Sequence, residues 1–475
     1  MSSWLDSFDT ANDDDLAVVD DGDSIRYGQL RDAALRIAGF LHGRYGTAGY
    51  LTLSAVPTID FVATLVGVMY SGNVPIPLAA DLPAESVEYV RRKSGAVAHI
   101  APLSLREVAG ARPLDARSND LPAMIMFTSG TTGFPKGVII SHDNLTHACS
   151  AIADYLDYHS HQSAAVVLPL HYSYALLSQV CCMLSAGGFV RLFASFRNPI
   201  KFSQAVAELQ LSTFCGVPST YQALAMFHRL SPLSMPTVRV LCSAGAAMDH
   251  ARYRTIQEMF PNAAFFNNYG MTEAAPRIAY IRDDDPRFDQ PTCGRPMNGV
   301  QVKVIDPDTH TELQDGQRGV LVVKGPNITG GYLNDPEQTQ VAFTQDGYLI
   351  SNDIAYLDEG YIYICGRQDD MFNVAGEKVA PLEVERALNG VAAIDVSAVR
   401  GVSDEQRGMV PAAFVKLAQP ATRKDLVAAL RDKLPAIKIP VRYFEVSDFP
   451  TTANGKLRRG QLSPDNATYV LREIL

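Results

Sequence analysis

Helix-like and strand-like segments alternate along the first part of the chain, and this alternation limits the fold more than any other feature. From about Asp14 to Ile200, amphipathic stretches are separated by short β-branched runs such as VVLPL (166–170) and FVRLF (189–193). This order is typical of parallel strands that are joined by crossover helices. The sequence therefore predicts an α/β fold for this region.

The pattern of apolar and polar residues changes twice further along the chain. Between Thr292 and Val323, the alternating segments VQVKVID and GVLVVKG predict a small antiparallel unit beside the main sheet. From Gly366 the chain has helices and strands of its own, which predict a compact α+β module. Its expected helices are Pro381 to Asn389 and Thr422 to Lys433, with strands around Val396 and Ala412. Because 475 residues exceed the usual size of one core, we expect two domains, 1–366 and 367–475.

Charge and cysteine usage narrow the functional classes. A formal net charge of -10 disfavours a general grip on nucleic acid, although the local patch Lys456, Arg458 and Arg459 could bind phosphates. We therefore expect a small anionic ligand. The seven cysteines lack metal-type spacing, are interpreted as structural, and fit a reducing compartment.

Two segments bear on location. The acidic start MSSWLDSFDTANDDD lacks the regions of a signal peptide, which predicts a cytoplasmic protein. The apolar stretch from Phe61 to Ala79 contains two glycines, Asn73 and two prolines, so we interpret it as a buried helix that runs into a strand and expect no membrane span.

A loop rich in hydroxyl groups and glycine follows the predicted strand Met124 to Phe127. It reads TSGTTGFPKG from Thr128 to Gly137 and is followed by VII and by Ser141, a candidate helix N-cap. Three glycines permit unusual backbone conformations, four hydroxyls supply donors for polyphosphate oxygens, and Lys136 adds a positive charge. A solvated turn is the simpler alternative. A Walker P-loop is excluded because Pro135 and Gly137 flank the lysine.

The whole string resembles the phosphate-binding signature of the acyl-adenylate-forming superfamily, which includes acyl- and aryl-CoA synthetases, luciferases and adenylation domains of nonribosomal peptide synthetases. Other motifs of that superfamily follow in the same order from about Ser24 to Arg459. The resemblance implies a large adenylate-forming N-terminal domain of mixed αβαβα sheets and a small, mobile α+β C-terminal domain. It also implies ATP and Mg²⁺ as cofactors. The nucleotide residues that it assigns are Thr128, Ser129, Gly130, Thr131, Thr132, Lys136, Asn268, Tyr269, Gly270, Asp353 and Arg367.

The motif NNYGMTE (267–273) carries chemistry that is sensible by itself. Tyr269 offers an aromatic face to a base, Thr272 a hydroxyl to a phosphate, and Glu273 a hard oxygen ligand to Mg²⁺. A helix start with Thr272 and Glu273 as capping residues is the structural alternative. The segment SAGAA (243–247) would let backbone approach a flat ligand closely. Before Asp353, which in the family binds the ribose, this chain has Ser351-Asn352 where the family usually has Thr-Gly.

The C-terminal motifs resemble the moving parts of the family. GRQD (366–369) matches the hinge, with Asp369 as the pivot, and NVAGEKVAP (373–381) matches the loop of the second half-reaction, with Gly376 at a pantetheine channel. A hairpin turn is the simpler interpretation of that loop. PTTANGK (450–456) matches the loop of the catalytic lysine, Lys456. In the family this lysine reaches the substrate carboxylate and the α-phosphate, where negative charge must be offset.

The acid is predicted from the segment LPLHYSYAL (168–176). Amino-acid-activating relatives usually have an Asp there, whereas this chain has His171 followed by Tyr172, which disfavours a free α-amino acid. His171 is assigned the role of thiol-tunnel gate, with a satisfied buried histidine as the alternative. No second cation is evident except Arg277, so an aryl or medium-sized acyl acid is expected. The predicted pocket residues are His171, Tyr172, Tyr174, Val217, Pro218, Ala244, Gly245, Ala246 and Met271.

The predicted activity is an AMP-forming acid-thiol ligase with coenzyme A as the preferred acceptor. Catalysis is assigned to Lys456, Glu273, Thr272 and His171, with Glu273 as the Mg²⁺ ligand. A stand-alone enzyme that loads a phosphopantetheine carrier protein is the first alternative. An inactive homologue that serves as a binding protein is the second, and the intact Lys456, Glu273 and Asp353 argue against it.

Overall fold

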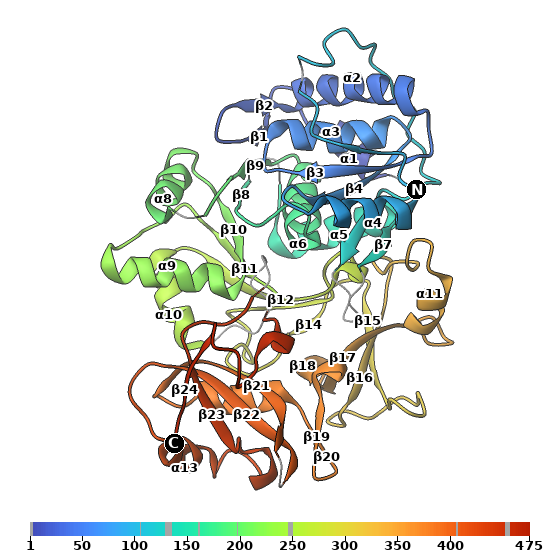
Figure 1. Cartoon of the computed structure of the whole chain (residues 1–475). Helices are drawn as coiled ribbons and strands as arrows, with labels where there is room; N and C mark the ends of the chain where they lie inside the picture. Colours follow the sequence, from blue (N-terminus) through green and yellow to red (C-terminus); the bar gives the residue numbers. More distant parts are fainter. Residues whose placement is uncertain are drawn as a thin grey trace. The chain divides into compact units, whose positions relative to one another are not determined.

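The computed structural model of the chain describes residues 3–475 apart from 105, 129–134, 160–161, 197, 246–249, 405–406 and 452–456, and only the backbone of 250–252. The chain divides into two compact units (Figure 1). Unit 1 comprises residues 1–302 and 323–350, and unit 2 comprises residues 303–322 and 351–475. The alternating helices and strands confirm the predicted α/β class.

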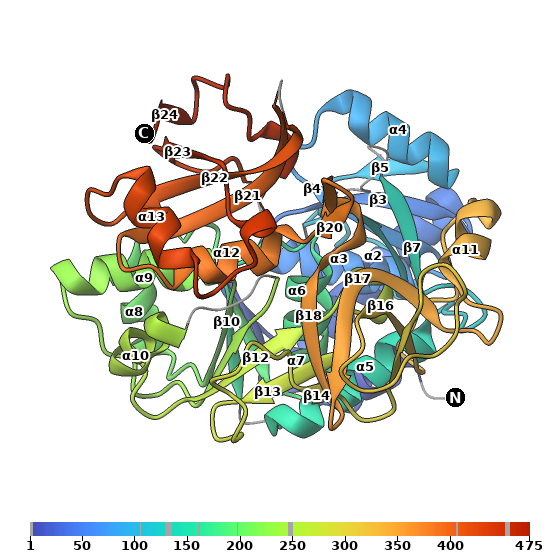
Figure 2. The same cartoon turned by 90° about the horizontal axis from the view of Figure 1, so that it is seen from below.

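Unit 1 is built on a nine-stranded sheet in the order β14-β13-β12-β11-β10-β8-β9-β1-β2. From β12 to β1 the neighbouring strands are parallel, and antiparallel strands close both edges. β12, β13 and β14 are visible side by side in Figure 2. The strands are β1 (Leu16–Val19), β2 (Ser24–Arg26), β8 (Ser163–Val166), β9 (Phe189–Leu192), β10 (Thr213–Gly216), β11 (Val240–Ser243), β12 (Ala264–Tyr269), β13 (Ala279–Arg282) and β14 (Arg295–Pro296).

A three-stranded parallel sheet and a hairpin complete the strands of unit 1. The sheet has the order β4-β3-β5 and the hairpin pairs β6 with β7. Their bounds are β3 (Tyr50–Ala55), β4 (Val74–Ala79), β5 (Ala98–Ile100), β6 (Met124–Thr128) and β7 (Lys136–Ile140).

Helices cover these sheets: α2 and α3 lie side by side, and α3 is next to β3 and β4 (Figure 1). The helices of unit 1 are α1 (Trp4–Asp9), α2 (Tyr27–Tyr45), α3 (Ile59–Tyr70), α4 (Ala84–Ser94), α5 (His142–Leu156), α6 (Ser173–Ala175), η1 (Leu176–Cys181), α7 (Cys182–Ser185), α8 (Pro199–Glu208), α9 (Pro218–Leu230), α10 (His250–Met259), η2 (Thr272–Ala274) and α11 (Pro336–Ala342).

The predicted helix-to-strand reading of residues 61–79 is confirmed. α3 begins after the N-cap Thr58, whose side chain accepts a hydrogen bond from the Phe61 amide, and it is buried along its whole length before the chain enters β4. No described helix is both long and apolar enough to cross a membrane. Ser141 caps α5 as the sequence predicted, in a reciprocal pair of hydrogen bonds with Asn144.

Unit 2 contains the predicted α+β module. Its four-stranded sheet β21-β22-β23-β24 is covered by α12 and α13, whose apolar faces form its core with the sheet (Figures 1 and 2). The expected helix Pro381 to Asn389 is α12, and the expected strands are β21 and β22. The other strands form the order β15-β16-β17-β18 and the hairpin β19-β20.

The elements of this part of the chain are β15 (Gln301–Ile305), β16 (Gly319–Lys324), β17 (Leu349–Asp358), β18 (Tyr361–Arg367), η3 (Gln368–Asp370), β19 (Phe372–Val374), β20 (Glu377–Val379), α12 (Pro381–Asn389), β21 (Ile394–Asp404), β22 (Gly408–Leu417), α13 (Arg423–Leu430), η4 (Ala436–Lys438), β23 (Arg442–Val446), η5 (Arg459–Gln461) and β24 (Val470–Glu473).

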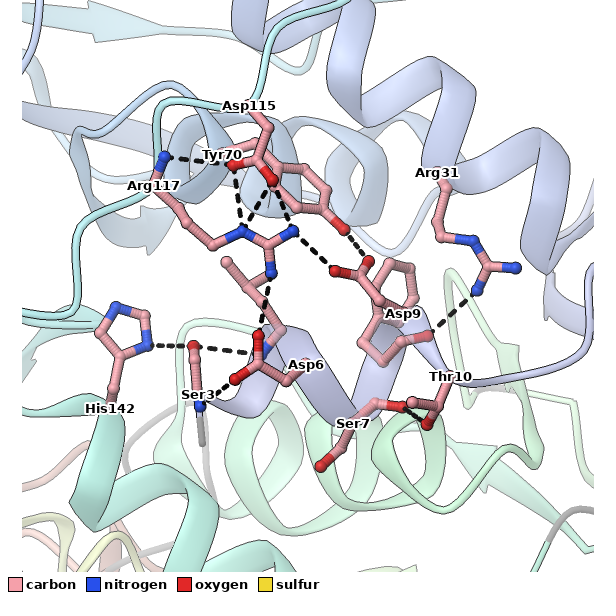
Figure 3. A network of polar contacts seen from close by, with 12 residues as sticks. Ser3, Asp6, Ser7, Asp9, Thr10, Arg31, Tyr70, Asp115, Arg117 and His142 are labelled. Atoms are coloured by element: carbon pink, nitrogen blue, oxygen red, sulfur yellow. Dashed lines mark hydrogen bonds and ion pairs between the residues drawn. The ribbon is translucent and has the colours of Figure 1, made fainter. Parts of the chain in front are cut away.

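The N-terminal helix α1 is held to the rest of unit 1 by the Arg117 guanidinium (Figure 3). Its Nη2 lies 2.7 Å from Asp9 Oδ2 and 2.6 Å from Asp115 Oδ2, and its Nη1 lies 3.3 Å from Asp6 Oδ1. The guanidinium also stacks over Tyr70, whose hydroxyl donates to Asp9. One cation therefore offsets three carboxylates. Burial acts to raise the pKa of Asp115, but the hydrogen bonds from Arg117 lower it overall.

Arg117→Met should lower the free energy of unfolding by about 1–2 kcal/mol, between the values typical of exposed and of buried ion pairs. The substitution leaves three carboxylates close together without a cation. Urea and thermal unfolding measure the change, and Arg36→Met is the control because Arg36 forms a single ion pair with Asp32 on one helix. Since the pKa of Asp115 is lowered, the stabilisation by Arg117 is present above the unfolded pKa and is lost as the pH falls. Equal effects of both variants would contradict this role.

Candidate active site

Four neighbouring parallel strands deliver the predicted motifs to one edge of the main sheet. The segment 168–176 follows β8, Val217 follows β10, Ala244 follows β11, and Gly270 follows β12. β10 and β11 end level, because Gly216 pairs with Ser243, and β12 continues from Asn267, the partner of Ser243, to Tyr269 at the same edge. Ligands of open α/β sheets bind beyond the carboxyl ends of the strands. This edge is therefore the candidate active site.

The predicted phosphate loop connects the two strands of the β6-β7 hairpin. Thr128 and Lys136 face each other at the end of the hairpin nearest the loop, so the strand, loop and strand order is confirmed. Lys136 Nζ donates to Gln338 Oε1 at 2.7 Å and lies 5.4 Å from the centroid of the Tyr332 ring. The other predicted residues of this loop, Ser129, Gly130, Thr131 and Thr132, lie outside the described residues.

Tyr332 connects this hairpin to Glu273. Its hydroxyl donates to Glu273 Oε1 at 3.0 Å, while its backbone bridges to Val138 in β7. Burial, together with the negative charge of Glu273, raises the pKa of Tyr332, so the phenol stays protonated and remains a donor at neutral pH. Glu273 Oε2 has no hydrogen-bond partner among the residues that the structure describes, which leaves an acceptor for a cation. Tyr332 was not predicted from the sequence, because its local signal is only an aromatic residue after two glycines.

Thr272 ties the NNYGMTE motif to the predicted acid segment. Its Oγ1 lies 2.9 Å from Ser173 Oγ, at the start of α6. The capping alternative is not observed, because Met271 is the residue before η2 and neither Thr272 nor Glu273 precedes the helix. Gly270 is required by close packing, since a Cβ there would lie 1.9 Å from the Pro276 carbonyl oxygen.

His171 and its aromatic neighbours lie at the end of β8. The rings of His171 and Tyr172 are 4.1 Å apart between centroids. Burial lowers the pKa of His171, and the weaker effect of Asp81 opposes the shift, so the imidazole is neutral at pH 7. The Tyr174 hydroxyl is buried and has no hydrogen-bond partner in the described part of the chain. Burial raises its pKa well above the usual value.

The remaining residues of the predicted acid pocket differ in burial. Ala244 is buried, whereas Val217 and Met271 are half-buried. Gly245 has a φ of +89°, and a Cβ on it would lie 3.6 Å from Val217 Cγ1. Ala246 lies outside the described residues.

Asn268 and Tyr269 occupy the end of β12 and differ in environment. Tyr269 is half-buried, whereas Asn268 is 6% exposed. Asn268 Oδ1 accepts from the Tyr155 hydroxyl at 3.1 Å and from Arg277 Nη1 at 2.5 Å. Tyr155 was not predicted from the sequence, because it comes from the distant helix α5 and carries no motif.

In unit 2, Asp353 and Arg367 are opposite each other on the β17-β18 pair. Arg367 Nε lies 3.8 Å from Asp353 Oδ1, and the Asp353 amide donates to Ser351 Oγ. Asp369 is exposed in η3. Gly376 has a φ of +91° in the turn between β19 and β20, so the predicted loop has the local form of a hairpin. Lys456 lies outside the described residues.

Comparison with known proteins agrees with this arrangement. The profile of the family described as AMP-binding enzyme matches residues 6–120 and 104–333, and that of the AMP-binding enzyme C-terminal domain matches residues 383–456. The chain belongs to the AMP-binding enzyme family. Its superfamily, predicted from the motifs, is confirmed.

Two relatives of this AMP-binding enzyme are CoA ligases. A feruloyl-CoA synthase from Amycolatopsis sp is 31% identical over 476 residues, which cover 94% of this chain and 95% of the relative. A 4-coumarate–CoA ligase from Petroselinum crispum is 28% identical over 368 residues, 74% of this chain and 68% of the relative. The protein is therefore an AMP-forming acid-thiol ligase that uses ATP and coenzyme A, as predicted.

Solved structures confirm the fold of the AMP-binding enzyme. ATP-bound MatB from Rhodopseudomonas palustris has a TM-score of 0.88 at 26% identity and covers 96% of this chain and 97% of its own. The o-succinylbenzoate CoA synthetase from Bacillus subtilis has a TM-score of 0.85 at 22% identity, covering 98% of each chain. The expected large mixed α/β domain followed by a C-terminal domain is thus confirmed.

Gly270→Ala should reduce kcat/KM by about 100-fold, the loss that a misplacement of about 1 Å can cause. The new methyl group collides with the Pro276 carbonyl and displaces the segment that carries Thr272 and Glu273. Initial rates of pyrophosphate release measure the loss. Gly43→Ala is the matched control, because nothing lies within 4 Å of its Cβ position in α2 and alanine favours a helix. Unchanged activity of Gly270→Ala would contradict the packing argument.

Proposed function

We propose that this ligase activates an aryl or medium-sized acyl acid as its acyl-AMP and then passes the acyl group to coenzyme A. The observation that carries the proposal is the row of strand ends at one edge of the main sheet, where apolar and aromatic residues of the acid segment adjoin the Thr272 and Glu273 motif. The relatives named for ferulate and 4-coumarate support an aryl acid. The absence of Asp beside His171 argues against a free α-amino acid.

In the first step a carboxylate oxygen of the acid attacks the α-phosphate of ATP, and pyrophosphate leaves. We assign Lys456 to offset the charge between carboxylate and α-phosphate, and the loop residues Thr128 to Thr132 with Lys136 to hold the leaving phosphates. The Glu273 carboxylate, oriented by Tyr332, fits a Mg²⁺ ion, which would neutralise phosphate charge when bound. Thr272 is assigned to the α-phosphate.

The base and ribose of ATP are assigned to the end of β12 and to unit 2. Tyr269 is proposed to cover the adenine, with Asn268 and Gly270 beside it. Asp353 is proposed to accept both ribose hydroxyls, with Arg367 close to it on the neighbouring strand. A carboxylate is a suitable acceptor for a diol because it offers two oxygens.

The thiol step is proposed to use a second arrangement of the chain. The predicted C-terminal domain, 367–475, would turn about Asp369, so that Gly376 lines the pantetheine channel while His171 gates it. The exposed position of Asp369 and the open space around Gly376 support these roles. The thiol attacks the acyl carbon, the thioester forms and AMP leaves.

A cytoplasmic, reducing location is also proposed. All seven cysteines fall within the described residues, and none forms a disulfide. Thiols that stay reduced are typical of such compartments.

Pyrophosphate release with a panel of carboxylic acids tests the proposed function. With ATP, Mg²⁺ and coenzyme A, aryl and medium acyl acids should each yield AMP, pyrophosphate and an acyl-CoA, whereas free α-amino acids should not. A carrier protein bearing phosphopantetheine replaces coenzyme A in a parallel arm. Transfer to the carrier alone would favour the loading enzyme, and no nucleotide turnover with any acid would favour a binding protein; either outcome contradicts the proposal.

Lys456→Ala should abolish formation of acyl-AMP but leave the rate of transfer from supplied acyl-AMP to coenzyme A within about threefold. The reason is that the lysine charge stabilises the transition state of the first step only. Lys433→Ala is the control, a lysine whose Nζ contacts only the Gly390 carbonyl in the described chain. Separate assays of the two half-reactions measure the split. Equal loss in both steps would argue against two arrangements of the C-terminal domain.

A further inference from the structure

Arg277 is a buried cation that the proposed mechanism does not use. It follows η2 and is 2% exposed, which places it among the largest fully buried side chains of the described residues. Its Nη1 donates to Asn268 Oδ1 at 2.5 Å and to the Tyr155 hydroxyl. Both partners are neutral.

No carboxylate among the described residues lies within 4 Å of the Arg277 guanidinium, and neither Nε nor Nη2 has a hydrogen-bond acceptor there. Burial lowers the pKa of Arg277 to about 9, and no acidic group opposes this shift. The group is still charged at pH 7. A buried charge is costly unless it is paired and hydrogen-bonded.

The rings beside Arg277 offset only part of this cost. Its Cζ lies 5.8 Å from the centroid of the Tyr155 ring and 5.8 Å from that of the Tyr174 ring. Such cation–π contacts stabilise a guanidinium by less than its burial without a counter-ion destabilises it. A purely structural role therefore leaves the charge incompletely compensated.

Arg277 contacts both the predicted acid segment and the NNYGMTE motif. Tyr174 belongs to the predicted acid segment, and its buried hydroxyl also lacks a partner in the described chain. A Cβ on Gly270 would lie 2.9 Å from Arg277 Cα, so its backbone packs against the NNYGMTE motif. Asn268 belongs to the same motif. An anion held by the free guanidinium edge would thus be part of the acid that is being activated.

We propose that Arg277 makes this ligase select acids that carry a second carboxylate besides the one that reacts. This inference rests on the proposed function and narrows its substrate class to dicarboxylic aryl or medium acyl acids. The guanidinium edge, through Nε and Nη2, matches a carboxylate in a bidentate manner. The Tyr174 hydroxyl can donate to the same group.

The test compares matched acids on the full-length enzyme. 4-Carboxycinnamate is paired with 4-methylcinnamate, and hexanedioate with hexanoate, so that each pair differs in one anionic group. Pyrophosphate release in the presence of ATP, Mg²⁺ and coenzyme A gives kcat/KM. We expect the dicarboxylic member to be preferred by at least about tenfold, as polar discrimination of this kind allows. Preference for the monocarboxylic members by the unaltered enzyme would overturn the inference while leaving the proposed function intact.

Variants separate a substrate contact from a structural role. Arg277→Met should lower kcat/KM for the dicarboxylic acids by about 10- to 100-fold and leave the monocarboxylic acids within about threefold, and Arg277→Lys should retain part of the preference. Arg282→Met is the control, an exposed arginine on the next strand. Equal losses for both members of each pair, with a lowered melting temperature, would overturn the inference. If Arg277→Met does not fold, the inference is tested by the unaltered enzyme alone, through the ratio of the kcat/KM values for the two members of each pair. Turnover of no acid at all would overturn the proposed function itself.

Discussion

The register of four parallel strands is the constraint on which the site depends. Because Gly216, Ser243 and Asn267 are paired across β10, β11 and β12, the loops that follow these strands begin at the same edge of the sheet. Parallel strands need crossover connections, so every loop at this edge leaves a strand in the same direction. Short motifs that lie up to a hundred residues apart in the sequence thereby meet at one edge. The chain is packed closely at this edge, and a Cβ has no room at Gly270.

Much of the fold and the general chemistry could be predicted from the sequence, because they are encoded in local patterns. The cap at Ser141, the buried α3 and the hairpin around the phosphate loop each depend on a few adjacent residues. Contacts over long sequence distances could not be predicted in this way. Tyr332 reaches Glu273 and Tyr155 reaches Asn268 only because the sheet brings their elements together. The burial of Asn268 depends equally on which strand face it occupies.

The placement of single cations explains how a protein of negative net charge can bind two anionic substrates, ATP and a carboxylate. The chain has a net charge of -10, so the cations that matter must be placed locally. Lys136 is held by Gln338 over the Tyr332 ring, at the end of the phosphate-loop hairpin. Arg277 is held by neutral partners, so its charge stays available at the acid side. Glu273 is the opposite case, a carboxylate positioned by a phenol and left with one oxygen for a cation.

The central claim is that the acid's own carboxylate forms a bond to the α-phosphorus, so that the acid is activated as an acyl-AMP. Labelling both carboxylate oxygens of the acid with ¹⁸O and analysing the nucleotide product by mass spectrometry tests this claim most directly. Attack by the carboxylate forms the bond between its oxygen and phosphorus, and the later thiol attack breaks the bond between that oxygen and the acyl carbon. The account predicts one ¹⁸O in every AMP released with the thioester. Unlabelled AMP, or ADP as the nucleotide product, would contradict it.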